Sequence, residues 1–246
     1  MTELGLPDTI LACLFDLDGV VTKTAVVHAA AWKEAFDQFL HGYEGERARP
    51  FDAVTEYDEY VDGRPRADGV RSFLRSRGIE LPEGVPDDPP DVHTVHGLGN
   101  RKNELLLEKI RTEGVEAYDG TLRYLEAVRA RGLRTAIVSS SANCRDVLRS
   151  IGAEHLFDVR IDGVAPRARR GPAPPRPPPW RPAPAPGGGG PGAPAVFEDA
   201  LAGMDAGRAG RFGYVVGVDR VGQRDALYTH GADVVVKDLA ELGGKG

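Results

Sequence analysis

Short apolar runs alternate with amphipathic stretches at the start of the chain and throughout its second half. The run from Ile10 to Phe15 is typical of a buried strand that ends at Asp16. From Tyr118 onwards, further apolar runs alternate with stretches in which apolar residues recur at helical spacing. The expected strands are 133–138, 157–161, 195–197, 214–218 and 233–236, and the expected helices are 120–131, 143–150, 200–209 and 223–230. Strands that alternate with helices form a parallel sheet covered on both faces, so the pattern predicts an α/β, Rossmann-like fold.

The region between the first strand and Tyr118 has a different pattern. Apolar residues at helical spacing predict helices over 26–40, 67–77 and 100–111, with Asn100 as a helix cap, and an aromatic, acidic stretch predicts another at 51–60. No convincing strand pattern occurs from Phe36 to about Asn103. We therefore expect a small all-helical cap domain, residues 26–111, inserted into an α/β core formed by residues 1–25 and 112–246.

Polar residues follow three of the expected strands, at the point where each strand ends. Because the carboxyl ends of parallel strands meet at one edge of the sheet, where ligands bind in open α/β folds, we expect these residues to lie together. Buried carboxylates without partners are costly, and a divalent cation with a phosphate group would provide partners. The alternative for an isolated pair of aspartates is a turn that caps the next helix. The residues are Asp16 and Asp18 with Gly19 in the turn, Ser139, and Glu198 with Asp199.

The string Asp16-Leu17-Asp18-Gly19-Val20-Val21-Thr22 resembles the first motif of the haloacid-dehalogenase-like phosphotransferases. The pair Glu198-Asp199 follows a strand, opens Asp-Ala-Leu-Ala-Gly and resembles the fourth motif of that superfamily. The stretch from Val138 to Asn143 resembles the second motif of its β-phosphoglucomutase-like subgroup. The helical insert and the order of the motifs resemble the same subgroup.

This resemblance implies roles for the residues at the strand ends. Asp16 is the expected nucleophile, since a carboxylate is ionised at neutral pH and attacks a phosphoryl group without an activating base. Asp18 is the expected general acid and base. The resemblance also implies a Mg²⁺ cofactor held by Asp16, the main-chain carbonyl of Asp18, Glu198 and Asp199.

The resemblance further implies which residues contact the substrate. It places His28 close to Asp18, and Arg66 at the position of a phosphate-clamping arginine. The alternative is that His28 is an ordinary structural histidine and that the Arg and Lys residues are solvated surface charges. Lys23 departs from related mutases, which carry an acid at this position, so the exact substrate stays open. The implied phosphate- and sugar-binding residues are Ser139, Ser140 and Asn143 in the core, Thr24, His28 and Trp32 after the first motif, and Arg66, Arg101, Lys102 and Asn103 in the insert.

Residues 165–194 do not fit the surrounding pattern. They are almost entirely Pro, Gly, Ala and Arg, a composition that forms neither a helix interior nor a central strand. The resemblance places a Gly-Lys-Pro phosphate-binding motif and a helix in this region, with the lysine near Pro174. Out-of-frame translation of GC-rich DNA typically yields these four residue types, so we interpret the segment as the product of two compensating frameshifts. The alternative is a genuine Pro-rich insertion in which Arg170 or Arg176 supplies the cation.

Composition narrows the class of protein further. With 41% hydrophobic and 28% charged residues, the chain is typical of a soluble globular protein, and no apolar run is long enough to span a membrane. A net charge of -6 argues against non-specific nucleic-acid binding. The first nine residues lack a secretory signal pattern, and two cysteines, Cys13 and Cys144, form no disulfide framework. We therefore expect a monomer in a reducing cytoplasm.

The leading functional hypothesis, which follows from the resemblance, is a Mg²⁺-dependent enzyme that moves phosphate between C1 and C6 of β-glucose. Its expected partner is a small sugar phosphate, neither nucleic acid nor membrane. A phosphatase that acts on sugar phosphates is the close alternative, because water can replace the sugar hydroxyl as acceptor. A degenerate, non-catalytic member of the family is a second alternative, since the expected lysine is absent.

Overall fold

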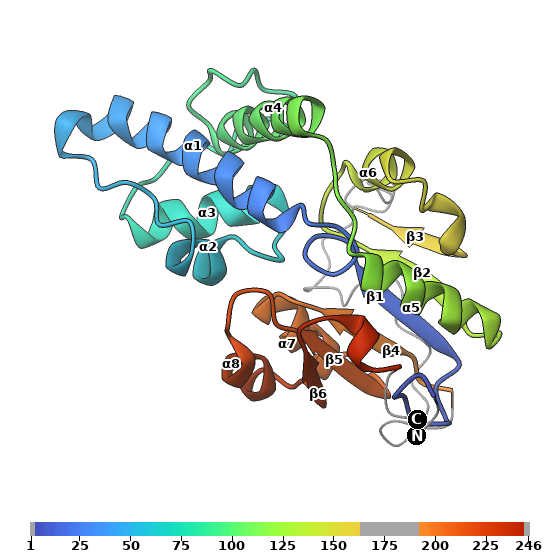
Figure 1. The fold of residues 1–246 in the computed structure, drawn as a ribbon. Helices are drawn as coiled ribbons and strands as arrows, with labels where there is room; N and C mark the ends of the chain where they lie inside the picture. The colour runs from blue at the N-terminus through green and yellow to red at the C-terminus, as the bar shows by residue number, and fades with distance from the viewer. Residues whose placement is uncertain (1–2, 163–191, 244–246) are drawn as a thin grey trace. The chain divides into compact units, whose positions relative to one another are not determined.

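The computed structural model describes residues 3–162 and 192–243 (Figure 1). The chain divides into two compact units, one formed by Met1–Lys23 with Glu116–Gly246 and the other by Thr24–Val115. The expected boundaries after residues 25 and 111 differ slightly from these. Most of the Pro- and Gly-rich segment, the expected lysine position and the two arginines offered as its replacement lie outside the described residues.

A six-stranded parallel sheet forms the centre of the first unit, as the alternating pattern predicted. The strand order is β3-β2-β1-β4-β5-β6, the arrangement of a doubly wound α/β fold. Chain connections run outward in opposite directions from β1 and β4, so the point where ligands bind in such folds lies between these two strands. The strands are β1 (Ala12–Asp16), β2 (Arg134–Val138), β3 (Val159–Ile161), β4 (Ala195–Glu198), β5 (Tyr214–Val218) and β6 (Val234–Val236).

Aromatic packing fixes the pairing of the two central strands. Phe15 in β1 lies opposite Phe197 in β4, and both side chains are fully buried. Their rings stack with centroids 4.3 Å apart. Because a shift by one residue would turn each strand's buried side chains toward the other face, this packing holds the register. The next residues along the two strands, Asp16 and Glu198, therefore emerge side by side at the edge of the sheet.

Helices cover this sheet at the places that the sequence pattern predicted. α5 packs against β2 and against the short helix η4 (Leu239–Glu241), while α7 and α8 pack against β4, β5 and β6. Gly217 in β5 allows a close approach, since a Cβ there would lie 3.2 to 3.3 Å from neighbouring side chains. The helices are α5 (Asp119–Ala130), α6 (Cys144–Ser150), α7 (Leu201–Ala209) and α8 (Arg224–Thr229), with η2 (Glu154–Leu156) before β3.

The second unit is all-helical among its described residues, which include every position from Thr24 to Val115. α1 packs along α4, and α3 packs against α4. Phe36, Phe51 and Phe73 meet in its centre with ring centroids 4.1 to 5.0 Å apart, and all three are buried. The helices are α1 (Ala25–Glu44), η1 (Gly45–Arg47), α2 (Thr55–Tyr60), α3 (Arg66–Ser76) and α4 (Val95–Glu113).

The start of α4 corrects the expectation that Asn100 caps this helix. The helix begins at Val95, and its cap is Thr94, whose hydroxyl accepts a hydrogen bond from the Gly97 N–H at 2.9 Å. Asn100 lies inside the helix and donates to the carbonyls of Pro86 and Asp88. Two glycines in this first stretch disfavour a helix in the sequence pattern. The structure requires Gly97 because the preceding loop approaches closely, and a Cβ there would lie 2.2 Å from the Val92 carbonyl. The expected helix at 51–60 is likewise shorter and begins only at Thr55.

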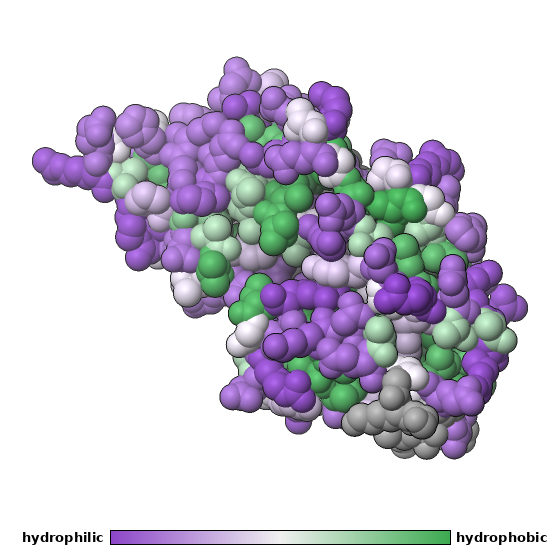
Figure 2. Space-filling view, viewed as in Figure 1, coloured by the Kyte–Doolittle hydropathy of each residue, from purple (hydrophilic) through white to green (hydrophobic). Residues whose placement is uncertain are grey.

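None of the helices in the described part of the chain is long and apolar enough to cross a membrane. In the view of Figure 2, hydrophilic residues predominate on the visible surface of both units, and hydrophobic residues form smaller patches among these hydrophilic residues. This distribution agrees with the ordinary hydrophobic and charged fractions of the sequence.

A buried carboxylate stabilises the helical unit. Glu56 accepts a two-point hydrogen bond from Arg77 at 3.0 and 2.7 Å, a bond from Arg49 at 2.7 Å and one from the Asp52 N–H at 2.9 Å. The side chains of Glu56 and Arg77 are only 12% and 9% exposed. Burial by itself raises the pKa of Glu56, but the hydrogen bonds from Arg77 and Asp52 and the charges of Arg77 and Arg49 outweigh it and hold the pKa below its ordinary value.

We predict that Glu56→Gln lowers the free energy of unfolding by about 2 to 4 kcal/mol, because it leaves the buried Arg77 guanidinium without its counter-charge. Since the folded-state pKa is the lower one, the stabilisation by Glu56 is present above its unfolded-state pKa and is lost as the pH falls through the folded value. Urea denaturation between pH 3 and 7 measures both effects. Glu104→Gln, at an exposed ion pair with Arg101, is the matched control and should cost less than about 1 kcal/mol. Equal losses of unfolding free energy for Glu56→Gln and Glu104→Gln would contradict a stabilising role for the buried Glu56 carboxylate.

Candidate active site

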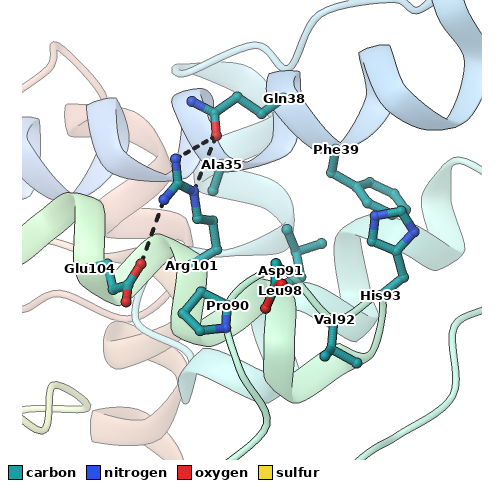
Figure 3. Close-up of a pocket in the computed structure, with 10 residues that line it drawn as sticks. All are labelled: Ala35, Gln38, Phe39, Pro90, Asp91, Val92, His93, Leu98, Arg101 and Glu104. Atoms are coloured by element: carbon teal, nitrogen blue, oxygen red, sulfur yellow. Dashed lines mark hydrogen bonds and ion pairs between the residues drawn. The ribbon is translucent and has the colours of Figure 1, made fainter.

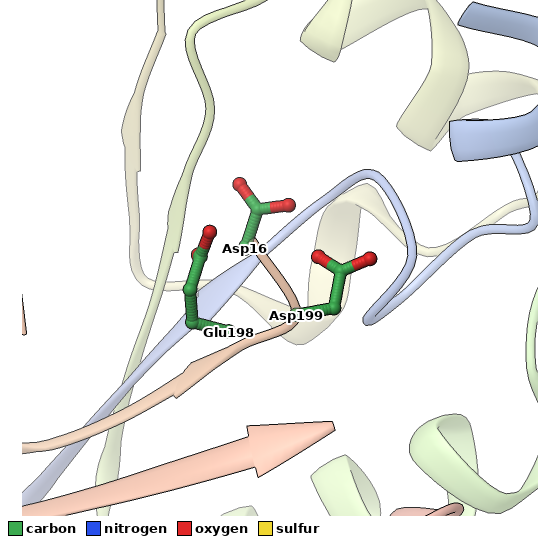
Figure 4. Close-up of side chains that lie close together, drawn as sticks. All are labelled: Asp16, Glu198 and Asp199. Carbon is green, nitrogen blue, oxygen red and sulfur yellow. The ribbon is translucent and has the colours of Figure 1, made fainter. Parts of the chain in front are cut away.

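Three carboxylates meet at the edge of the sheet where β1 and β4 end. Asp16 ends β1, Glu198 ends β4, and Asp199 follows directly. One oxygen from each side chain lies within 4.8 Å of the other two, and the three side chains project to the same side of the strands (Figure 4). The strand register thus brings together the two acidic motifs that the sequence analysis expected to meet.

The electrostatics of this carboxylate cluster are unfavourable without positive charge. Burial raises the pKa of Asp16, and the charges of Glu198, Asp18 and Asp199 raise it further, while a hydrogen bond with the Leu17 backbone opposes them only in part. The pKa of Asp16 therefore lies well above its ordinary value. A divalent cation would relieve this repulsion, and oxygen donors without a thiolate or imidazole are the ligands that Mg²⁺ prefers. The residues present fit a magnesium ion.

Two glycines make room for the carboxylates. Gly19 has a φ of 86°, and a Cβ on it would lie 1.7 Å from Oδ2 of Asp199. Gly203 lies in α7, where a Cβ would come within 2.1 Å of the Glu198 carboxyl group. In the sequence, the turn alone accounts for Gly19, and Gly203 carries no signal of this role, although it belongs to the Asp-Ala-Leu-Ala-Gly string. Both positions exclude a side chain so that an acid can occupy the space.

Internal hydrogen bonds make the turn after Asp16 rigid. The Gly19 N–H donates to the Thr22 carbonyl at 2.8 Å, and the N–H groups of Val21 and Thr22 donate to the Leu17 carbonyl at 3.0 and 2.9 Å. The hydroxyl of Thr22, which is fully buried, donates to the same Leu17 carbonyl. Asp18 therefore lies on a fixed turn, and its role as general acid and base stays a prediction.

The serine motif after β2 adjoins the same edge. Val138 lies opposite Asp16 in the sheet, and Ser139 follows it with 7% of its surface exposed. The Ser139 hydroxyl accepts from the Ser141 N–H at 3.0 Å, and the Ser141 hydroxyl accepts from the Asn143 N–H at 3.2 Å. These bonds fix the backbone of the motif, while Ser140 is exposed. A phosphate-binding role for Ser139, Ser140 and Asn143 stays a prediction.

Within the helical unit, three of the expected substrate-binding residues form one cluster. Lys102 in α4 is 4% exposed, and its ammonium lies 3.0 Å from Nδ1 of His28 and 5.1 Å from the centroid of the Trp32 ring in α1. An ammonium only donates, so a hydrogen bond between these two groups uses Nδ1 of His28 as the acceptor. Lysines are rarely this buried without a partner or a function. Thr24, at the start of α1, is also buried.

Arg101 points elsewhere, although it is adjacent to Lys102 in the sequence. Its guanidinium donates twice to Gln38 at 3.2 Å, lies 3.5 Å from Glu104 and lines a cavity of about 470 Å³ (Figure 3). Gln38 and His28 are ten residues apart in α1, or about 15 Å along the helix. Arg101 and Lys102 therefore contact different turns of α1. Arg66 packs beside Gly99 on α4, where a Cβ would lie 3.2 Å from the arginine.

Comparisons with known proteins place the chain among the relatives that the motifs suggested. A family model described as haloacid dehalogenase-like hydrolase matches residues 10–211. The chain belongs to this family. The chain is 53% identical over 245 residues to a β-phosphoglucomutase of Mycobacterium tuberculosis, and the match covers 97% of this chain and 94% of the relative.

More distant relatives agree with this assignment. A β-phosphoglucomutase of Bacillus subtilis is 29% identical over 232 residues, which cover 94% of this chain and 91% of the relative. Among solved structures, a β-phosphoglucomutase from Clostridium difficile superimposes with a TM-score of 0.67 at 21% identity, and the match covers 95% of this chain and 93% of that one. The structural likeness supports the fold, and the family predicted from the motifs is confirmed.

A pair of glycine variants in α7 tests whether the carboxylates form a cation site. We predict that Gly203→Ala weakens Mg²⁺ binding roughly 10- to 100-fold, because the new methyl group displaces the Glu198 carboxylate while leaving the backbone in place. Isothermal titration calorimetry measures the affinity, and thermal unfolding measures stability.

Gly207→Ala in the same helix is the control for this prediction. Its Cβ would lie 3.6 Å from Val215, an ordinary contact, so it should leave Mg²⁺ affinity unchanged and raise stability by about 0.5 to 1 kcal/mol. If Gly203→Ala bound Mg²⁺ as tightly as Gly207→Ala, Glu198 would not be a ligand.

Proposed function

We propose that the chain is a Mg²⁺-dependent β-phosphoglucomutase, which converts β-glucose 1-phosphate to glucose 6-phosphate through a bisphosphate intermediate. The observation that carries this proposal is the carboxylate cluster formed by Asp16, Glu198 and Asp199 at the junction of β1 and β4. The relative that is 53% identical along nearly the whole chain bears the name of this activity. Bound Mg²⁺ supplies the positive charge that allows an anionic nucleophile to meet an anionic phosphoryl group.

In the proposed mechanism, a carboxylate oxygen of Asp16 attacks the phosphorus atom of a phosphorylated sugar. The bond from phosphorus to the sugar oxygen breaks, and Asp18 donates a proton to that leaving oxygen. Asp18 then removes the proton from a hydroxyl of the acceptor sugar, whose oxygen attacks the aspartyl-phosphate and releases Asp16. Asp16, Glu198, Asp199 and the Asp18 main-chain carbonyl are the groups that would hold the magnesium ion, which would neutralise charge on the phosphoryl group.

A sugar-phosphate phosphatase of the same family is the second candidate. Lys23 departs from the mutase pattern described above, which leaves the exact substrate open, and its ammonium pairs with Glu116 at 2.7 Å. Water would then take the place of the acceptor sugar hydroxyl, and the aspartyl-phosphate would release inorganic phosphate. The acceptor therefore decides between the two activities.

The experiment that tests the proposal follows β-glucose 1-phosphate in the presence of Mg²⁺ and added glucose 1,6-bisphosphate. Formation of glucose 6-phosphate that depends on the bisphosphate supports a mutase, whereas release of free phosphate supports the phosphatase. A chain that does neither with Mg²⁺ present is the degenerate family member, and the proposal fails.

We predict that Asp16→Asn lowers the turnover number roughly 10⁴-fold or more in either assay, because an amide cannot form the phosphoryl-enzyme. Mass spectrometry of trapped enzyme should show the added phosphoryl group on the wild-type chain only. Asp205→Asn is the control and should retain full activity, because Asp205 lies in α7 with its exposed carboxylate 3.0 Å from Nδ1 of His230. Unimpaired turnover by Asp16→Asn would exclude the mechanism.

The two adjacent cations of α4 should differ in their effect on substrate binding. We propose that Lys102 and the neighbouring His28 contact the sugar phosphate, while Arg101 is held by Gln38 and Glu104 outside the site. Lys102→Met should therefore lower kcat/KM roughly tenfold or more through the loss of a charged hydrogen bond, and Arg101→Met should change it little. Steady-state kinetics on folded variants measure this, and the reverse order would show that Arg101 is the phosphate ligand.

We also propose a cytoplasmic monomer. Cys13 and Cys144 are free and buried, which agrees with a reducing compartment. Light scattering at micromolar concentration would measure the oligomeric state directly.

A further inference from the structure

We infer that Arg220 and Gln223 are positioning residues, which hold the turn carrying Asp18 and the backbone of Asp199 in the geometry that the reaction requires. The two side chains come from the loop between β5 and α8, which contains none of the motifs described in the sequence. The inference rests on the proposed function, because it assigns these residues a task at the same site.

Arg220 joins three segments of the α/β unit. Its Nε donates to the Gly19 carbonyl at 2.6 Å, and its Nη1 donates to the Lys237 carbonyl at 2.6 Å. The guanidinium carbon lies 3.4 Å from the centroid of the Tyr118 ring, so the group stacks on that ring. Tyr118 is itself tied to the turn, since its N–H donates to the Val21 carbonyl at 3.0 Å.

This contact completes the fixation of Gly19. Its N–H is bonded to the Thr22 carbonyl and its carbonyl to Arg220, so both polar groups of the residue are held. The Asp18 carbonyl belongs to the same planar peptide group as the Gly19 N–H and points the opposite way. The bonds that hold Gly19 thereby also set the direction of the Asp18 carbonyl, one of the proposed Mg²⁺ ligands.

Gln223 acts on the other half of the site. Its side-chain amide donates to the main-chain carbonyl of Asp199 at 3.0 Å. The loop that carries both residues is braced by Asp219, which is 8% exposed and accepts hydrogen bonds from the N–H groups of Gly222 and Gln223 at 2.7 and 2.8 Å. One rigid loop therefore contacts the backbone of both acidic motifs.

Within the described part of the chain, one buried nitrogen of Arg220 lacks a hydrogen-bond partner, and this unfavourable feature supports a functional role for the residue. Nη2 of Arg220 is buried, and among the described residues it has no hydrogen-bond partner. A buried donor without an acceptor is unfavourable, and native proteins retain such groups where another requirement prevails. A lysine could keep the charge but could not stack on Tyr118 and bond two carbonyls at once.

The test compares Arg220→Gln, Arg220→Lys and Gln223→Met with the wild-type protein. Amide hydrogen exchange without metal is the first readout. Both Arg220 variants should speed exchange at Gly19, Val21 and Thr22 about tenfold, while the amides of β1 stay protected.

The second readout is calorimetry with Mg²⁺ alone. In this measurement the Arg220 variants should bind Mg²⁺ roughly 10- to 100-fold more weakly, and Gln223→Met should show a smaller loss of affinity. Arg224→Gln is the matched control, because this arginine faces Tyr228 on the exposed side of α8.

The two readouts separate this inference from the proposed function. Wild-type protein that binds no Mg²⁺ and transfers no phosphate would overturn the proposed function, while exchange in the turn would still report on Arg220. Unchanged exchange at Gly19, Val21 and Thr22 in both Arg220 variants would overturn the inference. A lower melting temperature with unaltered Mg²⁺ affinity would also overturn it, because Arg220 would then stabilise only the fold. Retained affinity in Arg220→Lys alone would assign the effect to charge and refute a positioning role.

Discussion

The parallel pairing of β1 with β4 is the constraint on which the candidate active site depends. The stacked rings of Phe15 and Phe197 hold the register, and the register places Asp16 beside Glu198 where both strands end. Apolar burial thus provides the free energy that brings like charges together. The repulsion remains, as the raised pKa of Asp16 indicates, and a bound cation would relieve it.

The fold could be predicted from the sequence because a parallel sheet leaves a strong pattern. Each buried strand is a continuous apolar run, and the polar residues that follow it stand out. The start of α4 could not be predicted in this way. Gly97 disfavours a helix locally, and its reason for being there is the close approach of the Val92 carbonyl, a contact between segments whose pairing the sequence does not reveal.

The candidate site was predictable to the extent that its residues belong to recognisable sequence motifs. Asp16, Asp18, Glu198 and Asp199 belong to recognisable motifs, whereas Arg220 acts through the backbone carbonyls of Gly19 and Lys237. Any residue type supplies a backbone carbonyl, so such a contact imposes no pattern on the residues it joins. Gly203 is similar, since what matters there is the absence of a side chain next to Glu198.

The adjacent residues Arg101 and Lys102 in α4 differ in a way that the sequence alone does not reveal. Arg101 and Lys102 are equivalent neighbours in a sequence, but successive helical residues point about 100° apart. The structure directs one toward Gln38 and the other toward His28 and Trp32. The parallel sheet carries the candidate carboxylates, and the helical unit carries the cluster for which substrate binding is proposed. In the proposed function, mutase and phosphatase share the carboxylate cluster and differ in the acceptor, so side chains such as Lys102 and His28, and not the carboxylates, are where the two proposals differ.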